Sequence, residues 1–206
     1  MNTSTARATI FAKIEAATSA LKTQAPLPDY DVSMTHSLPK LAGTDLWEIF
    51  CRNFQAVNGK PMESVAQLLE FLQTTRQLHG YCDPALYDSI GSTLAAAGLT
   101  VETTYDRSRY DDYQFGITRA SGAIAESGSV IIDDLRTSHR LAALSPWVHV
   151  AVLERPEIHR TIAAALAALG TSPNIIWCTG PSKTADVEGI LIEGVHGPGE
   201  QIALLV

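Results

Sequence analysis

The sequence is poor in cysteine, and this scarcity excludes whole classes of protein. Three cysteines occur in 206 residues, Cys51, Cys82 and Cys178, and no two of them form a C-x-x-C pair. An all-cysteine iron–sulfur cluster needs four thiolates, so this chain cannot build one alone. Such sparse use of cysteine is typical of proteins in a reducing cytosol, without a disulfide framework.

Basic runs, long apolar stretches and metal-binding histidine spacings are lacking as well. Lys and Arg number 15 against 22 Asp and Glu, a net charge of -7, which argues against a nucleic-acid partner. The longest apolar runs, such as IAAALAAL, are far too short to span a membrane, and the first residues lack the apolar core of a secretion signal. We expect a cytoplasmic protein without a metal, because its six histidines show no H-x-x-x-H or H-E-x-x-H pattern.

The N-terminal part differs in pattern from the rest of the chain. A length of 206 residues suits one domain with a helical appendage. Positions 3–22 place apolar side chains at spacings of four, three and four, which predicts a helix. These side chains are Ile10, Ile14, Ala17 and Leu21. The proline-rich stretch 24–40 is typical of an extended connector. We therefore predict an N-terminal helix and connector at 1–40 and a main domain at 41–206.

The main domain is predicted to begin with two amphipathic helices. The first covers 44–59, and the second covers 64–78 with Ser64 and Gln67 as a capping box. From residue 83 on, helical stretches alternate with short β-branched runs. The predicted helices are 83–98, begun by Asp83-Pro84 and closed by Gly98, and 156–170. The predicted strands are 99–105, 127–133, 147–153, 173–178 and 201–206.

This alternation of strands and helices indicates an α/β fold with a largely parallel sheet flanked by helices. In such sheets, ligands bind beyond the carboxyl ends of the strands. The rule predicts a site formed by the loop after strand 173–178 and by the loop before residue 129.

The stretch FGITRASGAIAESGSVIIDD, residues 115–134, is the first that could carry chemistry. Gly128 permits a tight turn, so that backbone N–H groups and the hydroxyls of Ser127 and Ser129 can converge on a ligand. Thr118 adds a hydroxyl in the same stretch. Glu126 could act as a general base or a nucleophile. The alternative is a polar turn that leads into a strand, with Glu126 in solvent.

The second stretch, TGPSKTADVEG, follows a predicted strand. Gly180 begins a turn that prepares a helix start, where Ser182 or Thr184 could cap the turn and leave N–H groups free for an anion. Lys183 could add a charge, although the phosphate-binding pattern G-x-x-x-x-G-K-[ST] is absent. The alternative is that capping alone explains the two hydroxyls, with Asp186 placed to satisfy the helix dipole.

The third stretch is GVHGPGE. His196 lies between two glycines, the second of them Gly197, so the backbone there can come close to a substrate. The alternative is a hydrogen-bonded structural histidine. His149 lies inside the apolar run WVHVAV and is interpreted as a satisfied core residue, and His139 with Arg140 as a surface turn.

Three segments resemble the LUD domain of the lactate utilization proteins. They are GITRASGAIAESGS, LSPWVHVAVLE and GPSKTADVEGILIEGVHGP, in this order, and the resemblance covers residues 99–206 well. It implies a Rossmann-like fold akin to sugar-phosphate isomerases, CoA transferases and formyltetrahydrofolate cyclo-ligase. The departures are mild. Ser127 and Ser129 stand where Thr is common, Lys183 where Arg is common, and Val187 where Ile is common.

The resemblance also implies a function, namely a subunit of a system that oxidises L-lactate to pyruvate with partner proteins that carry iron–sulfur clusters. In that hypothesis the chain holds no cofactor and binds a small carboxylate or another anionic ligand in a glycine-rich polar pocket. The expected catalytic residues are Glu126, Asp186 and His196. The expected ligand-binding residues are Thr118, Ser127, Gly128, Gly180, Ser182, Lys183, Thr184 and Gly197. Two alternatives remain, a stand-alone transferase or isomerase acting on a CoA ester or phosphorylated small molecule, and a non-catalytic assembly subunit.

Overall fold

The computed structural model describes residues 3–19, 31, 38–170, 172–185 and 190–206. It divides into two compact units, residues 1–35 and residues 36–206. In the first unit, helix α1 (Thr3–Ser19) confirms most of the predicted N-terminal helix, and its Ile10, Phe11 and Ile14 are each more than half exposed. The domain boundary near residue 40 stays a prediction.

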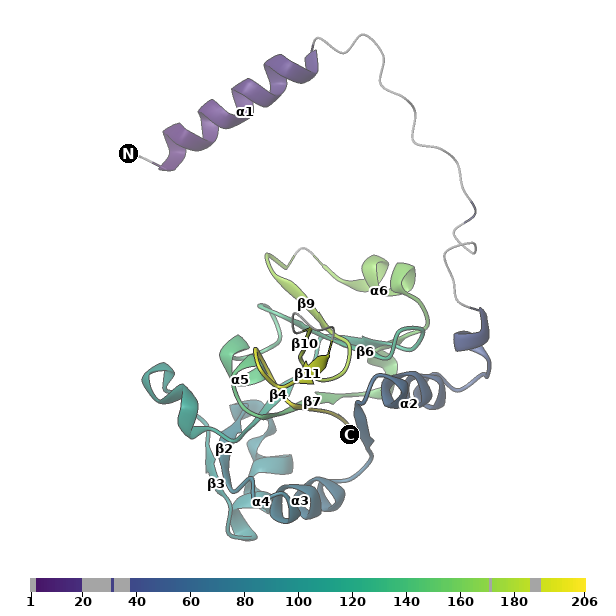
Figure 1. Ribbon diagram of the computed structural model, residues 1–206, viewed down its shortest axis with the longest axis vertical. Coiled ribbons are helices and arrows are strands. Elements are labelled where there is room, and N and C mark those ends of the chain that lie inside the picture. The colour runs from purple at the N-terminus through teal and green to yellow at the C-terminus, as the bar shows by residue number, and fades with distance from the viewer. Residues whose placement is uncertain (1–2, 20–30, 32–37, 171, 186–189) are drawn as a thin grey trace. The chain divides into compact units, whose positions relative to one another are not determined.

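A six-stranded sheet with only parallel pairings forms the centre of the second unit (Figure 1). Its order is β1-β12-β7-β4-β2-β3. The strands are β1 (Lys60–Met62), β2 (His79–Cys82), β3 (Thr100–Glu102), β4 (Phe115–Arg119), β7 (Val148–Leu153) and β12 (Glu200–Leu205). This sheet confirms the predicted α/β class. The sequence reading missed β1, β2 and β4, because these short strands contain Pro or Gly and lack a β-branched run.

A second sheet takes up strands that the sequence reading assigned to the parallel sheet. Its order is β8-β5-β6-β9, with β5 (Gly122–Ile124), β6 (Ser129–Asp133), β8 (Ile158–His159) and β9 (Ile175–Cys178). β6 pairs antiparallel with both β5 and β9, so the parallel assignment of 127–133 and 173–178 is wrong. The reason is local, since β5 and β6 are joined by a short turn, and only antiparallel strands can be joined in that way.

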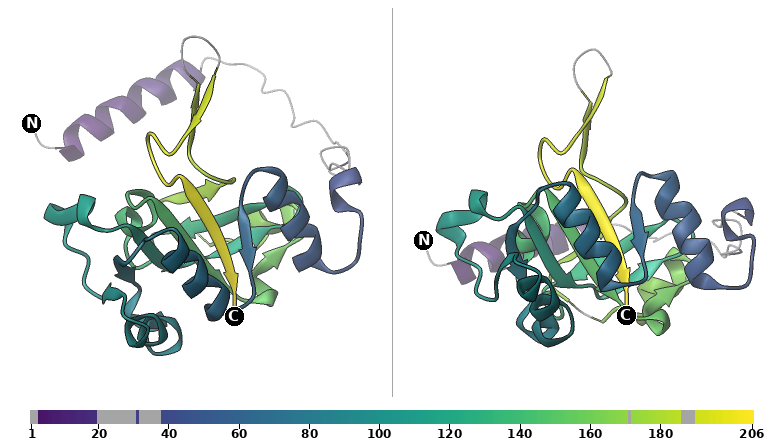
Figure 2. Two further views of the ribbon diagram at one scale, coloured as in Figure 1. Left: turned by 60° about the horizontal axis from the view of Figure 1, so that its bottom comes forward. Right: turned by 90° about the horizontal axis from the view of Figure 1, so that it is seen from below.

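Helices and the second sheet cover opposite faces of the central sheet. α3 (Val65–Thr74) and α4 (Ser92–Ala96) pack on one face, around Phe115 and Ile117 of β4. The other face packs against α2 (Leu46–Ala56) and against apolar side chains of the second sheet. Figure 2 shows the same body in two further orientations. Within the described residues, no helix combines the length and the apolar character that crossing a bilayer requires.

The two predicted helices at the start of the domain form because their caps and apolar stripes agree. Asp45 caps α2 by accepting from the N–H groups of Trp47 and Glu48, and Ser64 caps α3 by accepting from Gln67. Only this half of the capping box forms, because the Gln67 side chain accepts from Glu63 instead. Phe50 and Phe54 of the α2 stripe are fully buried, and burial of each contributes roughly 1.5–3 kcal/mol.

Two predicted helices are interrupted. Asp83 caps as predicted, but 83–98 splits into a 3-10 turn, η3 (Pro84–Leu86), a π-helical turn, η4 (Tyr87–Gly91), and α4. The predicted helix 156–170 begins only at α6 (Ile162–Ala168), behind the cap Thr161. Residues 158–159 pair with β5 instead, and η6 (Arg155–Glu157) precedes them. Sheet pairing at this point outweighs helix propensity.

Three short helical segments and one hairpin are the remaining described elements of the second unit. They are η2 (Leu38–Leu41), η5 (Arg107–Asp112), α5 (Arg140–Leu144) and the hairpin of β10 (Lys183–Ala185) and β11 (Leu191–Glu193). The hairpin projects from the body in both views of Figure 2. α5 lies on the face of the sheet that carries Gly116, where an added Cβ would come within 1.8 Å of the Ala142 carbonyl oxygen. Gly116 therefore permits the close approach of α5 to β4.

Candidate functional site

The glycine-rich loops after β9 and before β12 meet at the amino end of the central sheet. The Ser182 N–H donates to the Pro198 carbonyl at 2.8 Å, two residues before β12 begins. A Cβ added at Gly199 would lie 2.4 Å from the ring of Trp147, the residue before β7. The prediction of a site at the carboxyl end is therefore wrong for these loops. Because β9 belongs to the second sheet, its end does not lie at the carboxyl edge of the parallel strands.

These loops enclose a cavity of about 220 Å³, here called the loop pocket. Its walls come from α5, the end of β9, the two loops and the start of β12. The lining residues are Ala143, Leu144, Trp177, Cys178, Thr179, Gly180, Pro181, Ser182, His196, Gly197, Pro198 and Gln201. Four residues named from the sequence, Gly180, Ser182, His196 and Gly197, thus share one cavity.

Two glycines fix the backbone around the loop pocket. Gly180 has φ +74°, and an added Cβ would come within 2.0 Å of the Val57 carbonyl oxygen at the end of α2. A Cβ added at Gly197 would lie 3.0 Å from Cβ and 3.2 Å from Oγ of Ser182. The absence of side chains at both positions lets the two loops touch. Ser182 and His196 therefore line the same small space.

A chain of hydroxyls connects the first predicted stretch to the loop pocket. Ser127 Oγ lies 2.7 Å from Ser129 Oγ, which lies 2.7 Å from Oγ1 of the pocket residue Thr179. The sequence reading placed Ser127 in the site but did not single out Thr179 as a ligand-binding residue. The link depends on the antiparallel pairing of β6 with β9, which sets the start of one strand beside the end of the other.

A second connection runs through the buried polar residues of the sheet. Gln201, which lines the loop pocket, hydrogen-bonds with its side-chain amide to Nδ1 of His149, at 2.9 Å from Nε2 and 3.1 Å from Oε1. His149 Nε2 shares a hydrogen bond of 2.9 Å with Thr118 Oγ1. All three side chains are buried. Burial lowers the pKa of His149 to about 4, so this imidazole is neutral at pH 7.

The interpretation of His149 as a satisfied core residue is therefore confirmed, and Thr118 lies one hydrogen bond behind it. Thr118 is fully buried and does not line the loop pocket. The sequence reading missed Gln201, because nothing local to the chain sets it beside His149. The parallel register of β12 with β7, which pairs these two positions, does so.

Lys183 and Thr184 lie in β10, so the predicted helix start after Pro181 is wrong. β10 instead pairs antiparallel with β11, which aligns Lys183 with Glu193. The two charged groups lie 3.5 Å apart, and Glu193 also accepts from Asn58 Nδ2 at 2.7 Å. The hydrogen bond from Asn58, followed by that from Lys183, lowers the pKa of Glu193. Asp186 lies outside the described residues.

Glu126 and Gly128 lie in the turn against α2 and not in the loop pocket. Glu126 is 6% exposed, and its N–H donates to the Arg160 carbonyl at 3.1 Å. The alternative of a solvated carboxylate is therefore wrong. Gly128 has φ +62°, and an added Cβ would lie 2.4 Å from the Asn53 carbonyl carbon. Gly128 is thus required where the turn touches α2.

The loop pocket also contains a thiol. Burial raises the pKa of Cys178 to about 11, so the group is a protonated thiol at neutral pH and a poor nucleophile. In the described part of the chain, no three His, Cys, Asp or Glu side chains gather closely enough to hold a metal ion. The chemistry offered by the described pocket is that of hydroxyls, backbone groups and the His196 imidazole.

Comparison with known proteins adds a family. A model described as LUD domain matches residues 86–206. A lactate utilization protein C from Deinococcus radiodurans is 33% identical over 87 residues, which are 40% of this chain and 41% of that protein. One from Bacillus subtilis is 33% identical over 99 residues, 44% of this chain and 41% of that protein. One from Shouchella clausii is 27% identical over 192 residues, 83% of each chain.

A solved structure agrees with the fold. The crystal structure of a DUF162 family protein from Deinococcus radiodurans superimposes with a TM-score of 0.54 at 19% identity, over 82% of this chain and 98% of that one. This likeness shows the fold alone. The matched stretch spans about two fifths of the length of the relatives from Deinococcus radiodurans and Bacillus subtilis.

Proposed function

The chain belongs to the LUD domain family, and from this premise we propose that it is a cytoplasmic subunit of a lactate utilization system. In this proposal it binds lactate or pyruvate in the loop pocket, and its partners carry the iron–sulfur clusters. The name shared by the curated relatives, lactate utilization protein C, supports the assignment to lactate metabolism.

The observation that carries the ligand assignment is the convergence of two loops on one cavity. A volume of about 220 Å³ suits a three-carbon acid with some water. The hydroxyls of Ser182 and Thr179 are hydrogen-bond donors on its walls, and such groups bind carboxylate oxygens. His196 is exposed on the same wall, so solvent and substrate can both reach it.

The reaction defines what the residues would do. Lactate becomes pyruvate by losing two protons and two electrons, so the hydroxyl proton needs a base. In the proposal His196 takes this proton, and the hydroxyls of Ser182 and Thr179, which line the same pocket, hold the carboxylate. Asp186, which lies outside the described residues, is the carboxylate proposed to orient the ring. The carbon-bound hydrogen would leave as a hydride equivalent, which is two electrons with the second proton, to an acceptor supplied by the partner subunits, whose iron–sulfur clusters would then carry the electrons.

Reconstitution tests the proposal directly. Pyruvate formation from lactate is measured in the assembled complex with and without this chain, and with His196→Ala or His196→Gln. Loss of the base should lower turnover by about 10²–10⁴-fold in both variants, because glutamine restores hydrogen bonding but not proton transfer. Ser182→Ala removes one of the hydroxyls proposed to hold the carboxylate. Ser89→Ala, which changes an exposed serine outside the loop pocket, is its matched control.

The outcomes separate the alternatives. Equal rates with and without the chain would end the proposal. Full turnover of both His196 variants in a complex that needs the chain would instead indicate an assembly subunit. A stand-alone transferase or isomerase would show itself by thermal stabilisation with CoA esters or sugar phosphates, about 2.7 kcal/mol at a hundredfold excess over the dissociation constant.

A further inference from the structure

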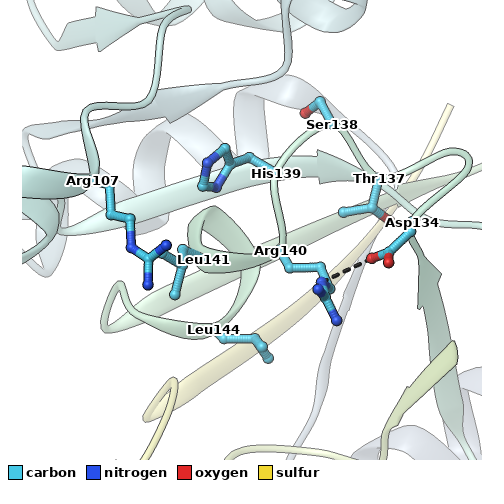
Figure 3. A pocket seen from close by; sticks show the side chains of 8 residues that line it. All are labelled: Arg107, Asp134, Thr137, Ser138, His139, Arg140, Leu141 and Leu144. Carbon is cyan, nitrogen blue, oxygen red and sulfur yellow. Dashed lines mark ion pairs between the residues drawn. The ribbon is translucent and has the colours of Figure 1, made fainter. Parts of the chain in front are cut away.

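A larger cavity, of about 470 Å³, lies beside the loop pocket, and the two share the wall residue Leu144 of α5 (Figure 3). We call it the arginine pocket. Its other lining residues are Arg107, Asp134, Thr137, Ser138, His139, Arg140 and Leu141. None of these belongs to the predicted site, and His139 with Arg140 was interpreted as a surface turn. Figure 3 shows Arg107 and Arg140 entering from different sides, with His139 between them.

The charges of the arginine pocket do not cancel. Arg140 pairs through Nε with Asp134 Oδ1 at 2.8 Å, and the other oxygen of Asp134 accepts from Asn174 at 2.6 Å. Within the described part of the chain, Arg107 makes no hydrogen bond and no ion pair. Two guanidinium groups against one carboxylate leave a positive charge in a cavity of a protein whose net charge is -7. This excess favours an anion.

His139 forms a fixed part of the cavity wall. Its Nδ1 is buried without a hydrogen-bond partner among the described residues, whereas nearly all buried polar atoms in proteins have one. The ring is held in place by stacking on Tyr105, with ring centres 4.4 Å apart. Burial, followed by the nearby charge of Arg107, lowers the pKa of His139. Because Nδ1 itself has almost no accessible surface, a bound molecule would contact the rest of the His139 ring, which lines the cavity.

The wall that carries His139 is built into the fold. The carboxylate of Asp133 accepts from the N–H groups of Leu135 and Arg136 at 2.9 and 2.8 Å, which fixes the turn after β6. Thr137 Oγ1 donates to the Arg119 carbonyl at 3.0 Å. Ser138 Oγ shares a hydrogen bond of 2.8 Å with the hydroxyl of the buried Tyr81. The segment 134–139 is therefore tied to the central sheet, and the cavity is preorganised.

We propose that the arginine pocket binds a small organic anion through a carboxylate or phosphate group, held between Arg107 and Arg140 and in contact with the His139 ring. A guanidinium group presents a planar fork of N–H donors that matches both oxyanions. The volume lies within the range typical of small-molecule sites. This site is separate from the loop pocket and does not depend on the proposed lactate function.

The test uses the full chain and two defined probes, inorganic phosphate and succinate. Binding is followed by calorimetry and by ¹⁵N NMR at constant ionic strength, with chloride as the third, control anion. Each probe is titrated to about 10 mM. A site that is still unsaturated at this concentration would bind the anion too weakly to be a specific site. We expect saturable binding of one probe, a shift of the His139 ring resonances and no saturation with chloride. The probe that binds distinguishes a phosphate site from a carboxylate site.

Arginine variants decide whether the binding lies in this cavity. Arg107→Gln should raise the dissociation constant about tenfold, because the substitution removes a charge-assisted hydrogen bond to the anion without breaking an ion pair within the protein. Arg140→Gln should act in the same direction. Arg76→Gln, an exposed arginine at the end of α3 on the opposite face of the sheet, should change the constant less than twofold.

Two results would overturn the proposal. One is the absence of saturable binding by either probe to wild-type protein. The other is an unchanged dissociation constant in Arg107→Gln, with its fold verified by circular dichroism. Loss of lactate-dependent turnover in His196 variants with intact anion binding would leave both sites assigned. Full turnover in the His196 variants with intact anion binding would remove only the loop-pocket proposal.

Discussion

The buried imidazole of His149 should make the protein sensitive to acid in a defined pH range. Burial lowers the pKa of this imidazole to about 4 in the folded chain, from 6.5 for a histidine exposed to water. A lowered pKa means that the unfolded state binds the proton first. The stabilising effect is thus complete above pH 6.5 and is lost as the pH falls towards 4. Between pH 7.5 and 4.5 protonation of this group alone should lower the free energy of unfolding by roughly 2–3 kcal/mol.

Urea unfolding of wild type and of His149→Gln at several pH values measures this effect. Carboxylates titrate in both proteins, so the difference between the two isolates the imidazole. The stability advantage of wild type over the variant should shrink by roughly 2–3 kcal/mol on going from pH 7.5 to 4.5. An NMR titration of the wild-type ring gives a second measurement, independent of whether the variant folds. Parallel stability curves, or a ring that protonates near pH 6.5, would refute the reasoning.

Three further predictions concern the hydroxyl behind His149, one glycine and one thiol. Thr118→Val leaves a buried ring nitrogen of His149 unpaired and should lower the free energy of unfolding in urea by about 1–3 kcal/mol. The control Thr93→Val, at an exposed position, should change it by less than about 0.5 kcal/mol. Equal effects of the two substitutions would contradict the hydrogen bond. Gly128 has a positive φ, and an added Cβ would lie 2.4 Å from backbone atoms, so Gly128→Ala should lower the stability of the fold by about 2–4 kcal/mol. Gly170→Ala, at a position where nothing lies within 4 Å of the added Cβ, should destabilise the fold less. The reverse ranking in thermal unfolding would refute the packing of the turn. Cys178, with a pKa of about 11, should react with iodoacetamide at pH 8 at least tenfold more slowly than free cysteine, as followed by mass spectrometry, and a comparable rate would disprove its burial.

Much of the fold could be predicted from the sequence, because it depends on residues that are neighbours along the chain. Ser64 and Asp83 cap where the sequence predicted, because a cap depends on residues only two or three positions away. The apolar runs 147–153 and 201–206 were also predicted as strands, and they largely coincide with the buried strands β7 and β12. Their apolar character is a local property of the sequence. The three motif segments also indicated the LUD domain family before any coordinates were considered.

The candidate site was predicted only in part. Gly180, Ser182, His196 and Gly197 were named from the motif stretches and the family resemblance, and the structure sets them around one cavity. Their position at the amino end of the sheet was not foreseen, because it depends on β9 leaving the parallel sheet. The arginine pocket was missed altogether. Its residues come from separate segments, η5 and the turn before α5, with no shared motif.

The sequence by itself determined the α/β class, the caps, the family and the residue types available for chemistry, all of which follow from neighbours along the chain. Only the tertiary structure decided which strands share a sheet and which polar side chains meet. Gln201, His149 and Thr118 lie on three strands, and their hydrogen bonds exist because the strand register aligns them. Register is set by the packing of whole faces over long chain separations, and no local pattern records it.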